Sequence, residues 1–257
     1  MSSFILSEIK GEIGIIKLNN LAKRNALSLE LTKGFISALK DFENNAAVSS
    51  IIITGEGKAF CAGADLTYLK SLQSNSLREN EKDSEVIAEL FLSLYECNKP
   101  TVAAVNGPAI AGGCGLAIAC DYVIAKKDSA TFGFTEVKIG FVPAIISFLL
   151  LKRLPEAKAR QLLISGTILS AEEAQIVGLV DFIEEDVLDF SFNLINNLSS
   201  NSRTSICETK KLLRHVSGSS YRQAVEYAKT VNTLSRTSKD FNKGLNSFLT
   251  KHGETNE

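Results

Sequence analysis

Residues 101–125 form a strongly apolar stretch that glycine and polar residues interrupt, and this stretch constrains the fold more than any other. The interruptions are Asn106-Gly107-Pro108, the cluster Gly112, Gly113 and Gly115, and Asp121. The pieces between them are too short to cross a bilayer, so the sequence predicts a buried core and no membrane span. TVAAV at 101–105 and DYVIA at 121–125 read as strands that flank a glycine-rich turn and a helix of small residues.

The region before this stretch adds a hairpin, a helix and a further strand. Residues 4–8 and 13–18 are rich in β-branched residues and flank Gly11-Glu12, which predicts a β-hairpin. Ser28 is the expected N-cap of a helix with apolar residues at helical spacing through Asn45. SIIIT at 50–54 is typical of a strand buried on both faces. Together these elements predict an α/β fold class.

The remaining segments are mainly helical by pattern. A helix is expected from about Ser84 to Cys97, while the polar stretch 68–83 is expected to be a mobile loop or a frayed helix. From residue 143 onward nearly everything reads as helix, including one that opens with the capping box Ser170-Ala171-Glu172-Glu173 and ends at Gly178. The 257 residues therefore predict an α/β core over 1–190 and a helical C-terminal region over 191–257.

Charge and composition exclude several classes of function. The 28 Lys+Arg and 29 Asp+Glu leave a net charge of −1, which provides no global basic field for nucleic acid or an anionic membrane. The 5 cysteines are scattered and include no C-x-x-C pair, so neither a disulfide framework nor a structural zinc site is expected, and a reducing cytoplasm fits best. The start of the chain does not resemble a secretory signal.

Histidine is too scarce for two common kinds of site. The only histidines are His215 and His252, both far along the chain from any candidate nucleophile, and no G-x-S-x-G string occurs. A serine hydrolase and a bound metal are therefore both disfavoured. Cys61 and Cys114 have no histidine nearby in the sequence and are expected to be small buried residues of the core rather than nucleophiles.

Two glycine-containing segments bring bare backbone to places that a ligand could approach. Residues 58–66 (KAFCAGADL) directly follow the strand at 50–54, and residues 105–116 (VNGPAIAGGCGL) lead from a strand through a turn into a helix. Free N–H groups at such a turn can hold an anion or a developing oxyanion, although the same pattern also suits a merely tight connection. Neither segment contains a G-x-x-x-x-G-K-[ST] or a G-x-G-x-x-G string.

Taken together, four strings resemble the enoyl-CoA hydratase/isomerase (crotonase) superfamily in order and spacing. They are FCAGADL, NKPTVAAVNGPAIAGGCGLAIACDYVIA, FGFTEVKIGFVPA and SGTILSAEEAQIVGLVD, and the resemblance covers almost the whole chain. It implies a crotonase-like spiral of ββα units, a helical C-terminal trimerisation region, and a homotrimer or a homohexamer built as a dimer of trimers. It also implies an acyl-CoA substrate, with no cofactor beyond that coenzyme A thioester.

The resemblance also implies the catalytic groups. A thioester enolate would be held by the backbone amides of Ala64 and Gly112, a role that requires main-chain donors placed before charge develops. Members that add water generally present two glutamates; here the second is Glu136, but Gly115 occupies the position of the first. Without the resemblance, Glu136 would read as a solvated charge at the end of a strand.

Coenzyme A would be held by two groups of residues. Lys23 or Arg24 would lie near the phosphates and the backbone around Ala62, Ala64, Asp65 and Leu66 near the adenine, while Phe248 and Lys251 of the last helix would reach a neighbouring subunit's site. Phe248 also suits plain helix packing, and Lys251 also suits a solvated charge at a helix end. Asp65 is expected to cap backbone N–H groups rather than act in catalysis.

Three functions remain open, and the sequence favours the first of them. The segment EVKIGFVPAIIS resembles hydratases of the methylglutaconyl-CoA and carboxygeranoyl-CoA type, which favours a hydratase that adds water to a 2-enoyl-CoA. An enoyl-CoA isomerase, in which one glutamate moves a proton between C2 and C4, is the alternative. A non-catalytic acyl-CoA-binding or scaffold homologue is the third, and the presence of Glu136 argues against it.

Overall fold

A computed structural model describes residues 4–251 and divides the chain into two compact units, Met1–Leu194 and Ile195–Glu257. The first unit contains a six-stranded sheet in the order β1-β2-β3-β4-β6-β9 and a three-stranded sheet in the order β5-β7-β8. The strands are β1 Ile5–Lys10, β2 Ile13–Leu18, β3 Ser50–Gly55, β4 Thr101–Val105, β5 Ala109–Ile110, β6 Tyr122–Lys126, β7 Thr131–Gly133, β8 Ile168–Ser170 and β9 Phe182–Glu184.

Helices connect the strands and then continue alone to the C-terminus. In the first unit they are η1 Leu21–Lys23, α1 Leu29–Asn44, α2 Leu66–Leu72, α3 Leu77–Glu96, α4 Gly112–Ile118, η2 Glu136–Ile139, α5 Ala144–Arg153, α6 Glu156–Ser165 and α7 Ala171–Val177. Helix α8 Val187–Leu198 runs across the boundary, and α9 Arg203–Val216, α10 Tyr221–Arg236 and α11 Lys239–Lys251 belong to the second unit.

The large sheet is built as its sequence pattern predicts. Strands β1 and β2 form an antiparallel hairpin, and β2, β3, β4, β6 and β9 are parallel neighbours. Every residue of β3 and β4 is buried, because parallel strands in an α/β sheet are covered on both faces. The apolar stretch 101–125 is thus confirmed as core. Within residues 4–251, no helix is both long enough and apolar enough to span a bilayer.

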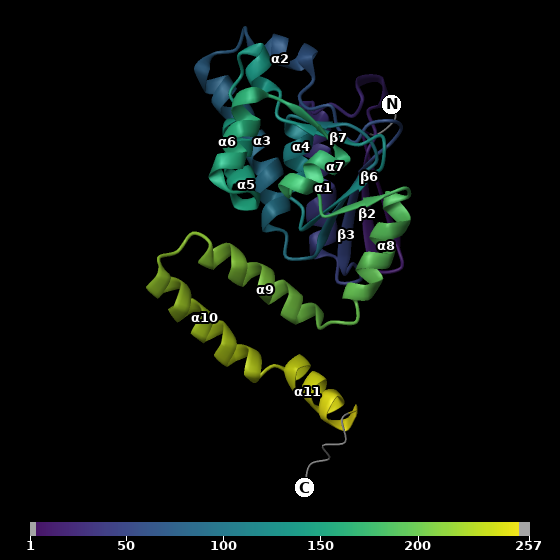
Figure 1. Cartoon of the computed structure of the whole chain (residues 1–257), viewed down its shortest axis with the longest axis vertical. Helices are drawn as coiled ribbons and strands as arrows, with labels where there is room; N and C mark the ends of the chain where they lie inside the picture. Colours follow the sequence, from purple (N-terminus) through teal and green to yellow (C-terminus); the bar gives the residue numbers. More distant parts are fainter. Residues whose placement is uncertain (1–3, 252–257) are drawn as a thin grey trace. The chain divides into compact units, whose positions relative to one another are not determined.

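Helices pack against the large sheet and against one another. Helices α1 and α4 pack against strands of the large sheet, and α3 packs against both of these helices (Figure 1). Ser28 caps α1 by accepting a hydrogen bond from the Leu31 amide, as predicted. The capping box at Ser170 and the end of α7 at Gly178 are also confirmed.

One expectation from the sequence is wrong, and a second has two exceptions. The stretch 68–83, expected to be a mobile loop or a frayed helix, consists mainly of two capped helices, since α2 covers its start and α3 begins at Leu77 with a capping box between Ser76 and Glu79. Its polar composition reflects exposed helix faces, and the Tyr68 hydroxyl donates to Asp83 to join the two helices. Most of residues 143–251 are helical as expected; the exceptions are β8 and β9, strands of three residues each, too short to show a period.

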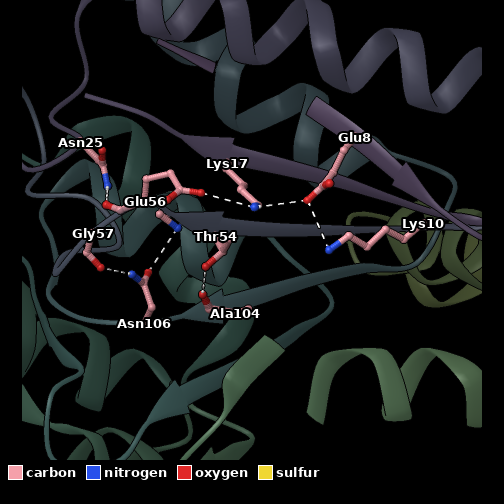
Figure 2. A network of polar contacts seen from close by, with 10 residues as sticks. Glu8, Lys10, Lys17, Asn25, Thr54, Glu56, Gly57, Ala104 and Asn106 are labelled. Atoms are coloured by element: carbon pink, nitrogen blue, oxygen red, sulfur yellow. Dashed lines mark hydrogen bonds and ion pairs between the residues drawn. The ribbon is translucent and has the colours of Figure 1, made fainter. Parts of the chain in front are cut away.

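A polar network ties together the carboxyl ends of β3 and β4, from which both glycine segments depart (Figure 2). The Asn106 side chain accepts from the Gly55 amide (3.2 Å) and donates to the Gly57 carbonyl (3.0 Å). The Thr54 hydroxyl donates to the Ala104 carbonyl at 2.8 Å. These bonds fix the starting point of each segment relative to the other.

Asn25 holds the loop after β3 from the other side. The side chain is fully buried, and its Nδ2 donates to the carbonyls of Glu56 (2.9 Å) and Ala59 (2.8 Å) while its Oδ1 accepts from the Asn20 amide (2.8 Å). Its φ of +59° lies in the left-handed region, which asparagine tolerates better than most residues. Each hydrogen-bonding group of this side chain therefore has a partner.

We predict that Asn25→Asp strongly destabilises the first unit. The carboxylate would face two carbonyl oxygens without a proton to donate, and a buried unpaired charge of this kind costs more than about 3 kcal/mol. The free energy of unfolding in urea measures this loss. Asn45→Asp is the matched control, because the Oδ1 of Asn45 only accepts, from the Ala47 amide at 2.9 Å, and an aspartate can do the same. Equal stability of the two variants would contradict the prediction.

Candidate active site

The two glycine segments lie directly against each other. Cys61 and Ala109 form a parallel bridge, and the Ile110 amide donates to the Cys61 carbonyl at 3.0 Å. A Cβ atom on Gly63 would lie 2.8 Å from the Ile110 carbonyl oxygen, and one on Gly113 would overlap the Cys61 carbonyl. Only glycine allows the two backbones to approach this closely, so these two glycines are required by packing.

The direction of the Ala64 amide follows from the hydrogen bonds of its neighbours. The Leu27 amide donates to the Gly63 carbonyl at 2.7 Å, and the Asp65 amide donates to the Leu27 carbonyl at 3.0 Å. Residues 4–251 contain no cis peptide bond, so the N–H of Ala64 points opposite to the Gly63 carbonyl. The Ala64 N–H is therefore directed away from Leu27.

The same reasoning fixes the direction of the Gly112 amide. The Ala111 amide donates to the Gly133 carbonyl at 2.7 Å, and the Ala111 carbonyl accepts from the Gly115 amide at 3.0 Å as the first bond of α4. Since this carbonyl points into the helix, the Gly112 N–H points out of the helix start. Ala111 has φ +51° and ψ −121°, a conformation that costs an alanine about 1–3 kcal/mol.

Neither the Ala64 nor the Gly112 amide has a backbone acceptor. Both residues are half-buried, and among residues 4–251 neither N–H donates a backbone hydrogen bond. The residues that precede them are in contact, because a Cβ on Gly63 would lie 3.0 Å from the Ala111 Cβ. An oxyanion hole requires two such main-chain donors.

Glu136 enters the same region from a third segment. Gly133, which accepts from the Ala111 amide, ends β7, and Glu136 begins η2 three residues later. Glu136 is only 7% exposed, and its Oε2 has no hydrogen-bond partner among the described residues. Burial raises the pKa of the Glu136 carboxyl, against the opposing effect of a hydrogen bond from its own amide. The side chain is a buried acid rather than a solvated charge at the end of a strand.

The position of Gly115 is filled by apolar side chains from other helices. A Cβ on Gly115 would lie 2.9 Å from Ile146 Cγ1 of α5 and 3.1 Å from Phe91 Cε1 of α3. Phe91 also reaches to 3.8 Å from the Cβ position of Gly112. Apolar side chains, and not a carboxylate, therefore occupy the space next to residue 115 of α4.

The cysteines of the two segments are buried, as expected. Burial raises the pKa of the Cys61 thiol to about 12, and it raises that of Cys114 as well, with the nearby Glu136 carboxylate adding to the effect. Thiolates are thus strongly disfavoured at both positions, which argues against a nucleophilic role.

Four of the eight residues expected to hold coenzyme A lie between Ala62 and Leu66, at the start of α2. Asp65 caps α2 by accepting from the Thr67 amide at 2.8 Å, which confirms its expected capping role. Burial acts to raise the pKa of Asp65, but the amides of Thr67 and Tyr68 and the Lys23 ammonium, 3.6 Å away, together lower it. Lys23 Nζ also donates to Thr67 Oγ1 at 2.9 Å.

The other residues expected to hold coenzyme A lie partly in the first unit and partly in the second. Arg24 is exposed, and its carbonyl accepts from the Ala62 amide at 3.1 Å, so Lys23, Arg24 and residues 62–66 form one surface region. Leu66 is exposed within that region. Phe248 is exposed on α11 of the second unit, and Lys251 ends that helix with its side chain outside the described residues.

Comparisons with known proteins show to which family the chain belongs. The model of the enoyl-CoA hydratase/isomerase family matches residues 8–255. The chain belongs to the enoyl-CoA hydratase/isomerase family. A 2,3-dehydroadipyl-CoA hydratase of Escherichia coli is 30% identical over 254 residues, covering 98% of this chain and 97% of its own length.

Further relatives support both the family and its fold. A short-chain-enoyl-CoA hydratase of Clostridium acetobutylicum is 31% identical over 213 residues, covering 81% of this chain and 80% of its own. The structure of a Polaromonas enoyl-CoA hydratase superposes with a TM-score of 0.90 at 30% identity, covering 96% of this chain and 97% of that one. The α/β fold expected from the resemblance is thus the fold of the solved family members.

Sequence reasoning missed the side chains that surround the glycine segments. Leu27, Phe91 and Ile146 come from three different elements and carry no motif, and only the contacts around Gly112 and Gly115 identify them. The conformation of Ala111 was missed as well, because an alanine gives no signal for a positive φ.

Because Glu136 is buried, we predict that its carboxyl lowers the free energy of unfolding increasingly as pH rises. Well below pH 4.5 the carboxyl is protonated in both the folded and the unfolded chain; as pH rises, the unfolded chain ionises first. Glu136→Gln should therefore become more stable than wild type as pH rises from 4.5 through the raised folded pKa. Urea unfolding at several pH values measures the difference, with Glu89→Gln as a surface control. A difference that does not grow with pH would contradict the prediction.

Proposed function

We propose that the chain is an enoyl-CoA hydratase that adds water across the double bond of a 2-enoyl-CoA. The observation that carries this proposal is the buried Glu136 carboxyl with a free Oε2, on the segment whose Gly133 carbonyl binds the Ala111 amide. The names of the hydratase relatives from Escherichia coli and Clostridium acetobutylicum support the same reaction.

The proposed mechanism uses main-chain hydrogens and one side chain. The thioester oxygen accepts from the Ala64 and Gly112 amides, which withdraw electron density from the double bond. Glu136 takes a proton from water as the water oxygen bonds to C3, and the electron pair of the double bond moves toward the thioester as an enolate. Glu136 then returns the proton to C2. Water is fully consumed in this sequence, and the carboxylate is regenerated.

An enoyl-CoA isomerase is the second candidate, and the apolar filling at Gly115 favours it. Moving a proton from C4 to C2 requires one carboxylate and no activated water. Phe91 and Ile146 occupy the place from which another acid would act, so a one-acid reaction suits this site. Both candidates use the same two amides and Glu136.

Binding of the substrate is proposed to use the surface region around Lys23 and Arg24. Both cations would lie near the phosphates, with the backbone of Ala62 to Leu66 against the adenine and Phe248 and Lys251 reaching the site of a neighbouring subunit. The proximity of Lys23 to Asp65 and the exposure of Arg24 support this assignment. No cofactor besides the thioester is required by the proposed steps.

Assembly into a homotrimer or a homohexamer is proposed from the second unit. Its helices α9 and α10 bury none of their residues, and apolar side chains of the unit remain exposed, namely Leu213, Val225, Leu234, Phe241, Leu245 and Phe248. Exposed apolar surface of this kind supports an interface between subunits. The five cysteines of residues 4–251 form no disulfide bond with one another, which supports a reducing cytoplasm as the compartment.

A direct assay separates the candidate functions. Crotonyl-CoA should lose the ultraviolet absorbance of its conjugated thioester when the protein adds water. A gain of that absorbance with a 3-enoyl-CoA would instead support the isomerase. Binding of both esters without any change in absorbance would support the non-catalytic homologue and overturn the proposal.

Adjacent glycines provide a matched test of the proposed donors. In Gly112→Val the new Cβ would lie 2.8 Å from Leu27 Cδ1 and 3.8 Å from Phe91 Cζ, which are the ends of side chains and not backbone, so the fold should survive. The side chain would displace the Gly112 amide from its place, so kcat/KM should fall about 100-fold or more. In Gly113→Ala the methyl group would overlap the Cys61 carbonyl, so the free energy of unfolding should fall. Thermal unfolding and hydratase kinetics measure both effects. Full activity of Gly112→Val would contradict the assignment of its amide.

A further inference from the structure

Ala111 stands apart among the residues with unusual backbone conformations. Four described residues other than glycine have a positive φ, namely Arg24, Asn25, Ala111 and Asp128. Asparagine and aspartate tolerate such conformations through their polar side chains, and Arg24 has the left-handed values φ +50° and ψ +43°. Ala111 combines φ +51° with ψ −121° and has only a methyl group.

The surrounding hydrogen bonds force this conformation on Ala111. Its amide is bound to Gly133 of β7 at 2.7 Å, while its carbonyl is bound to Gly115 of α4 at 3.0 Å. The chain must therefore leave the small sheet and enter the helix at one residue. The strain is maintained by two elements that are each anchored elsewhere.

The methyl group of Ala111 lies against the other glycine segment. A Cβ on Gly63 would be 3.0 Å from the Ala111 Cβ, so the alanine methyl occupies the space beside the bare Gly63. The peptide after Gly63 carries the Ala64 N–H, and the peptide after Ala111 carries the Gly112 N–H. The methyl group is thus attached to the residue that precedes one proposed donor and packs against the residue that precedes the other.

We propose that Ala111 is a positioning residue whose methyl group and constrained ψ fix the separation and direction of the Ala64 and Gly112 N–H groups. This inference rests on the proposed function of those amides. Glycine would adopt the same φ without strain, but it would also give the peptide between residues 111 and 112 freedom to rotate. An alanine at this position gives up stability in the folded state and keeps the donor fixed before the substrate arrives.

The test compares three variants and two readouts. Ala111→Gly removes the methyl group and the strain, Ala111→Ser keeps a Cβ, and Asp128→Gly relieves a positive φ in an exposed turn. The first readout is kcat and KM with crotonyl-CoA. The second is the ultraviolet absorbance of bound acetoacetyl-CoA, a β-keto thioester whose enolate form increases when its oxygen receives hydrogen bonds.

We expect Ala111→Gly to lower kcat about tenfold or more, with KM changed less, because misplacement of a reacting group by about 1 Å costs as much as 100-fold. The variant should still bind acetoacetyl-CoA but hold less of it as enolate. Its thermal midpoint should be at least as high as that of wild type. Ala111→Ser and Asp128→Gly should keep kcat close to the wild-type value.

Three results would overturn the inference. The first is an Ala111→Gly variant with wild-type kcat and enolate fraction, and the second is an Ala111→Ser variant that loses as much kcat as Ala111→Gly. The third is a thermal midpoint of Ala111→Gly below that of wild type, since relief of strain at residue 111 should not lower it. If wild type itself forms no enolate from acetoacetyl-CoA, the proposed function fails too, and that result is distinct from the other three.

Discussion

The planarity of two peptide bonds is the constraint on which the candidate site depends. The carbonyls of Gly63 and Ala111 are each bound to a main-chain amide, of Leu27 and Gly115 respectively, so the N–H on the far side of each peptide has a fixed direction. The sheet supplies the anchors, because both segments begin at the carboxyl ends of β3 and β4, where Asn106 links them. If either of these hydrogen bonds were lost, the N–H group of the same peptide would keep its chemistry but would no longer have a fixed direction.

The candidate site contains one buried acid and a helix face that leaves no room for another side chain. Phe91 of α3 and Ile146 of α5 fill the position that a side chain at residue 115 would take. Burial raises the pKa of the Glu136 carboxyl on η2, which makes the ionised form costly and a better proton acceptor. Packing at residue 115 and burial at residue 136 are thus two separate features of this region.

The order of strands and helices was largely predictable from the sequence, whereas the surroundings of the site were not. Periodicity and capping residues identified the hairpin, α1, β3 and α7, because those signals are local. The polar stretch 68–83 was misjudged since its helices, α2 and α3, owe their place to caps at Asp65 and Ser76 and to the Tyr68 contact with Asp83. The neighbours of Gly115 depend on how three helices pack, which no local pattern records.

The burial of the cysteines has a practical consequence for following motions of the first unit. Cys61 and Cys114 lie inside the contact between the two glycine segments, with thiols that stay protonated in the folded chain. A maleimide reagent can modify them only in molecules in which these segments have separated. Their labelling rate therefore counts opening events at the centre of the site, independently of any substrate.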